Sequence, residues 1–71
     1  MSNYINLADF YYAQGDYPRA LELYQKALDI KEKVLGKEHP DTATIYNNLA
    51  GVYRAQGDYP RALELYQKVL Y

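Results

Sequence analysis

The sequence contains no cysteine and no tryptophan, and only one histidine. Disulfides and thiolate metal sites are therefore excluded, and one histidine cannot build a histidine metal cluster. Eight lysine and arginine residues against nine aspartate and glutamate residues leave a net charge of −1, which argues against nucleic-acid or anionic-membrane binding. No apolar run approaches the ~20 residues that span a bilayer, and the N-terminus lacks the features of a signal peptide. We expect a soluble cytoplasmic protein without a cofactor.

The chain does have enough apolar material for one small core. Of its 71 residues, 49% are hydrophobic and 24% are charged, a balance that allows folding. Ten residues are tyrosine. Because they recur at helical spacing, we expect them in the core and at interfaces rather than in a base-stacking platform.

The chain repeats itself. Residues 13–26 and 55–68 both read AQGDYPRALELYQK, an offset of 42. With that offset, residues 1–29 align with 43–71, and 20 of the 29 positions are identical. We therefore interpret residues 1–71 as one domain, with a first repeat at 1–42 and a partial second repeat at 43–71.

Each repeat reads as a helix, a tight turn and a second helix. In the second copy, Tyr46 and Leu49 begin an apolar stripe with helical spacing. Gly57 supplies the left-handed residue that ends the helix, Asp58 is an N-cap, and Pro60 fits the next first turn. Sustained period-2 alternation is missing, so strands are not expected. The sequence predicts an all-α fold of four antiparallel helices, at residues 2–14, 17–35, 40–56 and 59–70.

The predicted helix 17–35 carries apolar residues over a wide surface. They form rows that run as far as Val34 and Leu35, and such a helix needs neighbours on two sides. The segment 36–40 that follows is a turn. His39, the only histidine, is expected to have a loop or capping role there, because no further metal ligands lie within sequence reach.

The apolar pattern resembles the tetratricopeptide repeat, aromatic-x2-Leu-small-x2-Tyr followed by Ala-x3-aromatic. Both copies have tyrosine at the usual tryptophan position, and the period of 42 exceeds the usual 34, as in the subclass found in kinesin light chains. The resemblance implies two stacked helix-turn-helix repeats of a right-handed superhelix, an α-solenoid whose first helices line a concave groove. It implies a scaffold that binds peptides or proteins, not an enzyme. The matching residues are Tyr4, Leu7, Ala8, Tyr11, Ala20 and Tyr24, then Tyr46, Leu49, Ala50, Tyr53, Ala62 and Tyr66.

Most differences between the copies fall in the first helix of each repeat. Four of them, at positions 2, 5, 9 and 12 and their counterparts, share one helical face. In the family this face looks into the groove, where an asparagine amide can hold a peptide backbone. Two alternatives stay open: drift of an exposed face, and a local hydrogen bond between helices for the asparagines. The groove candidates are Asn6, Asp9, Tyr12, Asn47, Asn48, Gly51 and Arg54.

Two ligand classes of the family are not expected here. Chaperone-binding members clamp a C-terminal carboxylate, but Ile5 and Asp9 occupy two of the clamp positions and only Asn48 matches. Kinesin light chains bind acidic peptides in a basic groove, whereas Arg54 is the one basic groove candidate in this chain.

The main hypothesis is thus a fragment of a longer repeat array that binds a peptide or partner protein. The alternative is a structural repeat unit, engineered or excised, that forms homo-oligomers through uncapped helical ends, by end-to-end stacking or helix exchange. An enzyme is not expected, because no nucleophile–base pair stands out. The self-association candidates are Leu63, Tyr66, Val69 and Leu70.

Overall fold

The computed structural model describes residues 2–69. Their elements are four helices: α1, Ser2–Ala13; α2, Tyr17–Leu35; α3, Pro40–Ala55; and α4, Tyr59–Val69. Every predicted helix is found with its ends within one residue, although the predicted end of the last helix at Leu70 lies outside the described residues. Within 2–69 there is no strand, and no helix is long and apolar enough to cross a membrane. The all-α prediction is confirmed.

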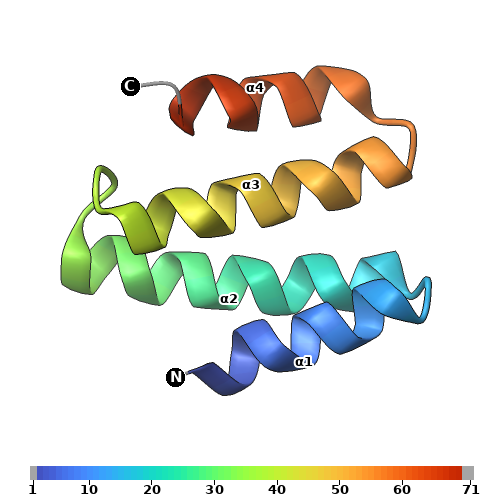
Figure 1. Ribbon diagram of the computed structural model, residues 1–71, viewed down its shortest axis with the longest axis horizontal. Helices are drawn as coiled ribbons and strands as arrows, with labels where there is room; N and C mark the ends of the chain where they lie inside the picture. Colours follow the sequence, from blue (N-terminus) through green and yellow to red (C-terminus); the bar gives the residue numbers. More distant parts are fainter. Residues whose placement is uncertain (1, 70–71) are drawn as a thin grey trace.

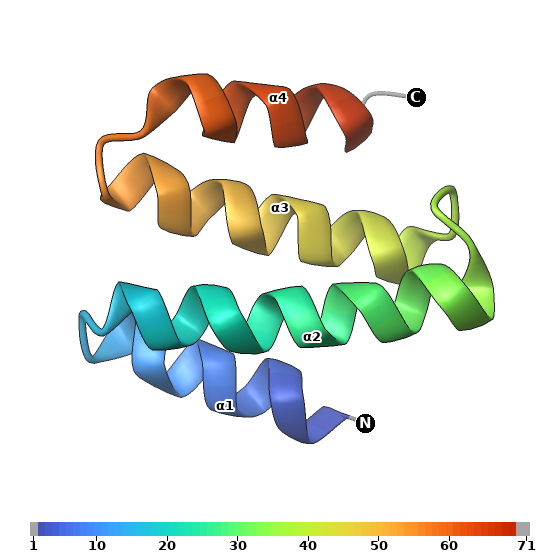
Figure 2. The ribbon, with the colours of Figure 1, turned by 180° about the vertical axis from the view of Figure 1, so that it is seen from behind.

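The helices lie side by side in chain order, each antiparallel to the next (Figures 1 and 2). α1 packs on α2 and α3 packs on α4, and these two hairpins stack through α2 and α3. Two stacked helix-turn-helix repeats are the result. α2 has a neighbour on each side, as its wide apolar surface predicts.

The two short turns have the same geometry. Gly15 has a φ of 82°, a left-handed conformation that glycine adopts without strain. Asp16 caps α2, since its carboxylate accepts the backbone N–H of Arg19 at 3.4 Å and lies 3.5 Å from the guanidinium Nε. That guanidinium lies over the ring of Tyr11, 5.5 Å from its centroid, a contact the sequence did not predict. The equivalent residues of the second copy are Gly57, Asp58, Arg61 and Tyr53.

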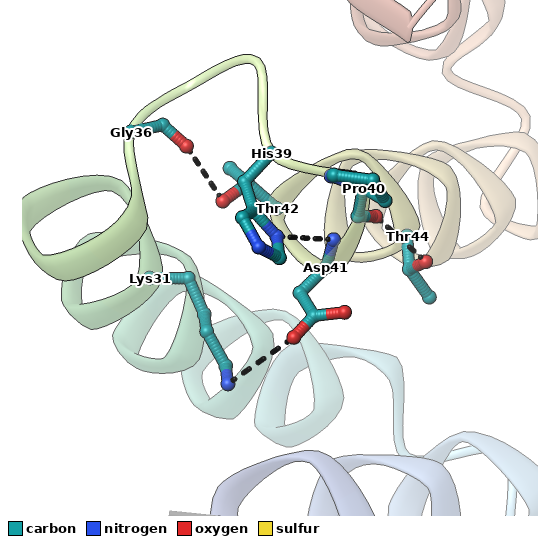
Figure 3. A network of polar contacts seen from close by, with 7 residues as sticks. All are labelled: Lys31, Gly36, His39, Pro40, Asp41, Thr42 and Thr44. Atoms are coloured by element: carbon teal, nitrogen blue, oxygen red, sulfur yellow. Dashed lines mark hydrogen bonds and ion pairs between the residues drawn. The ribbon is translucent and has the colours of Figure 1, made fainter.

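A longer turn joins the hairpins (Figure 3). The Nδ1 atom of His39 accepts the Asp41 backbone N–H at 3.0 Å and caps α3, which confirms its predicted capping role. The buried Thr42 hydroxyl donates to the carbonyl of Gly36 at 2.8 Å. Lys31 of α2 lies 4.0 Å from the Asp41 carboxylate. These contacts fix the start of α3 against the end of α2.

The core is centred on α3. Its largest fully buried hydrophobic side chains are Ile45, Leu49 and Val52, which all belong to that helix. The apolar rows of α2 are not covered at the end of the helix, where Val34 is 70% exposed and Leu35 is also exposed. α2 has 19 residues against 12 in α1, so its last turns extend past the end of its antiparallel neighbour.

Candidate functional site

The predicted groove residues define a surface that we call the variable face. Asn6, Asp9 and Tyr12 lie on α1 and are exposed. The remaining members lie on α3, where Asn47 and Arg54 are exposed and Asn48 and Gly51 are half-buried. The side chains of the variable face are thus accessible from solvent, although two members are partly covered.

The α1 half of the variable face is supported from behind by tyrosines of α2. The hydroxyl of the buried Tyr24 donates a hydrogen bond to the Asp9 carboxylate. Burial, then the bond to Asp9 and its charge, raise the pKa of Tyr24 above its usual value, so this hydroxyl stays a donor. The ring of Tyr12 packs on Tyr17 at a centroid distance of 5.6 Å. Asp9 and Tyr12 are therefore held in place before any ligand arrives.

The α3 half is built differently. Gly51 stands where α1 has Asp9, so the equivalent tyrosine, Tyr66, has no carboxylate at that position. Among the described residues, no ion pair involves Arg54. No side-chain hydrogen bond within the same residues involves Asn6 or Asn48. The amides and this guanidinium have unused hydrogen-bonding capacity.

A shallow hollow of about 170 Å³ lies between α1, α2 and α3. It is lined by Ile5 of α1, Lys31 of α2, and Asp41 and Thr44 of α3. Ile5 and Thr44 belong to the positions that differ between the copies, whereas Lys31 and Asp41 were missed by the sequence reasoning. No pattern in the sequence indicates their ion pair, because it forms only when α3 folds back on α2.

The two outer helices carry exposed apolar side chains. On α4, Leu63 is 58% exposed, while Tyr66 and Val69 are half-buried. Leu70, the fourth predicted self-association residue, lies outside the described residues. On α1, Leu7 is 45% exposed and Phe10 is 55% exposed. Leu7 belongs to the repeat pattern, whereas no sequence pattern points to Phe10.

Metal binding has no support within residues 2–69, where no three histidine, cysteine, aspartate or glutamate side chains form a group that could hold an ion.

Comparison with known proteins shows the family. Residues 1–70 match the model of the tetratricopeptide repeat. The chain belongs to the tetratricopeptide repeat family. Proteins of this family generally mediate protein–protein interactions, and their repeats are typically non-enzymatic scaffolds.

Individual relatives match about half of the chain. A nucleotide-binding leucine-rich repeat-like protein of Hyaloscypha variabilis is 46% identical over 37 residues, 52% of this chain and 4% of that protein. The clustered mitochondria protein homologs of Homo sapiens and Danio rerio are 48% and 50% identical over 40 residues, 56% of this chain. The match spans 3% of each homolog's length. The tetratricopeptide chain is thus similar to a small part of much larger proteins.

Proposed function

We propose that this tetratricopeptide chain is a protein-interaction module that binds an extended peptide segment of a partner along the variable face. The observation that carries the proposal is the contrast between the two copies. The tyrosine, leucine and alanine residues of the repeat pattern are the same in both copies, whereas four differences gather on one face of the first helices. Separate demands of packing and of ligand binding would produce this contrast.

The chemistry of the face suits a peptide backbone flanked by two different side chains. Asn6 and Asn48 occupy equivalent positions on α1 and α3, and each amide offers one acceptor and two donors. Tyr12 provides an aromatic surface on α1, and Arg54 provides a cation at the equivalent position on α3. A ligand with an apolar group toward α1 and an acceptor group toward α3 fits this arrangement.

Two finer assignments belong to the same proposal. We infer from the 42-residue period that the repeats are of the kind found in kinesin light chains. The expected place of action is the cytoplasm.

The test is selection of binding peptides from a random displayed library, followed by calorimetry on purified chain and peptide. Asn6→Ala and Asn48→Ala should each weaken binding by about two- to tenfold, the value of one lost hydrogen bond. Asn3→Ala is the matched control, because Asn3 is an exposed asparagine of α1 outside the variable face. Failure to select any peptide, or an equal loss in the Asn3→Ala control, would overturn the proposal.

A further inference from the structure

Equivalent residues of the two copies differ in burial, and the difference locates uncovered surfaces. Leu7 and Leu49 occupy the same repeat position, yet Leu7 is exposed and Leu49 is only 2% exposed. The apolar position three residues further along the helix shows the same difference in burial, since Phe10 is exposed and its counterpart Val52 is 1% exposed. α3 has α2 before it in the stack, whereas no described helix precedes α1. Leu7 and Phe10 therefore lie on a surface that, in α3, is covered by the preceding helix.

The opposite end of the stack shows the complementary difference. Leu63 of α4 is exposed, whereas its counterpart Leu21 of α2 is half-buried and packs against the core. Tyr59 is also more exposed than its counterpart Tyr17. Tyr17, however, packs on Tyr12, which the second copy replaces by Arg54, so the two leucines give the clearer comparison of burial. α2 is followed in the stack by α3, and no described helix follows α4. Leu63 thus marks the surface on which a following helix would pack.

The chain holds both halves of an interface that it already makes internally. The first ten residues of α4, 59–68, are identical to the first ten of α2, 17–26. α1 shares its Tyr4, Leu7, Ala8 and Tyr11 with the equivalent positions of α3. A contact between α4 of one copy and α1 of another therefore continues the α2–α3 packing with largely the same side chains.

We propose that this chain self-associates head to tail, with Leu63 of α4 packing against Leu7 and Phe10 of α1 in a second copy. The contact joins two different surfaces, so each added copy offers the same free ends again. An open series of oligomers follows, rather than a closed dimer.

The interface is weaker than its internal counterpart. Asn3 replaces the buried Ile45, and Phe10 is larger than Val52, so the fit changes. The internal contact also has the hydrogen bond from Tyr46 to Glu32 and that from Thr42 to Gly36. Glu32 lies in the last turns of α2 and Gly36 lies in the turn after it, and neither has an equivalent in residues 43–71, which align only with residues 1–29. Association should therefore depend visibly on concentration.

The decisive experiment is sedimentation equilibrium over about a hundredfold concentration range. The average mass of the unsubstituted chain should rise steadily from 8.3 kDa without a plateau at the dimer. Leu7→Lys and Leu63→Lys should each remain monomeric alone, because each blocks one of the two surfaces. An equimolar mixture of both variants should form a dimer and stop there, since each supplies the surface that the other lacks.

Val34→Lys is the matched control, because it replaces an exposed apolar residue of α2 that lies on neither surface. It should associate like the unsubstituted chain, and loss of association in it would refute a specific contact. A monomeric unsubstituted chain, or a mixture that stays monomeric, would also overturn the proposal. If Leu7→Lys still dimerised alone, α4 would pair with α4 and the head-to-tail contact would be wrong. Helical circular dichroism verifies folding, and Leu7→Gln and Leu63→Gln replace any lysine variant that unfolds.

Discussion

The hydroxyl of Tyr24 donates a hydrogen bond to the carboxylate of Asp9, and the equivalent pair does not exist in the second repeat. Tyr66 stands where Tyr24 does, but Gly51 replaces the aspartate. One substitution on a first helix thus changes the surroundings of a tyrosine on the second helix. The two hairpins are alike in fold and unlike in polar bonding.

Tyr24→Phe should therefore lower the free energy of unfolding by about 1 kcal/mol, the value of one hydrogen bond to a partly exposed partner. Tyr66→Phe is the matched control and should change stability by less than half as much, because no side-chain hydrogen bond of Tyr66 occurs among the described residues. Urea denaturation of the three proteins measures both values. Equal losses would show that the bond to Asp9 contributes nothing.

The leucine pair of the first helices gives a second internal comparison. Leu49→Ala should cost about 2–5 kcal/mol, because it opens a cavity in the core. Leu7→Ala should cost at most about 1 kcal/mol in dilute solution, since much of its side chain already meets water. Thermal unfolding at two protein concentrations measures the costs. The loss for Leu7→Ala should grow with concentration if a second copy covers α1, and a constant small loss would contradict that contact.

Replacing Gly57 and Gly51 by alanine should change the free energy of unfolding in opposite directions. A Cβ at Gly57 or Gly51 would meet no atom within 4 Å, so steric contacts do not separate the two sites. Gly57 has a φ of 83°, and Gly57→Ala should cost about 1–2 kcal/mol. Gly51 lies inside α3, where Gly51→Ala should raise stability by about 0.5–1 kcal/mol. Chemical denaturation measures the free energy of unfolding of both variants. A change of the same sign at both sites would show that the backbone angle φ does not cause the difference.

Ionisation of the Tyr46 hydroxyl should lower the free energy of unfolding at high pH. Its hydroxyl donates to Glu32 of α2, and Lys68 of α4 lies over its ring at 5.5 Å. Burial first, then the hydrogen bond and the charge of Glu32, raise the pKa of Tyr46 from 10.0 to about 12. The folded chain then holds this proton more tightly than the unfolded chain does. The resulting stabilisation is complete below pH 10 and disappears as the pH rises through 12.

The measurement is the free energy of unfolding as a function of pH for the unsubstituted chain and for Tyr46→Phe. The difference between them should shrink by on the order of 1–3 kcal/mol between pH 10 and pH 12. Tyr59→Phe removes the hydroxyl of an exposed tyrosine and should run parallel to the unsubstituted chain. A constant difference for Tyr46→Phe would mean that its proton is held equally in both states.

Much of the fold could be predicted because each helix has its own local signals. Glycine with positive φ and an aspartate cap end and start the helices at the short turns, and proline follows at the first turn. Periodicity also places residues correctly on one face of a helix. It does not tell whether another helix covers that face, since Leu7 and Leu49 share one repeat position although Leu7 is exposed and Leu49 is buried.

The candidate site could be predicted in part. Differences between the copies single out residues of α1 and α3, which the structure shows at accessible positions on those helices. The contributions of α2 could not be predicted in this way. Lys31 reaches Asp41 only after the long turn reverses the chain, and Tyr24 reaches Asp9 only across the packed hairpin. Such contacts depend on the distance between helices, which no local pattern records.

The long turn between the hairpins has a consequence for the shape of any longer assembly. Thr42 and Gly36 lock the last turn of α2 to the first turn of α3, and Lys31 adds a tie to Asp41 beside them. Together with the α2–α3 packing, these bonds hold the rotation from one hairpin to the next. When units of identical length repeat, an identical rotation at each joint accumulates into a constant pitch. The turn therefore contributes to the curvature of a multi-repeat array, and Thr42→Val, which removes the hydroxyl but keeps the volume, should change that curvature.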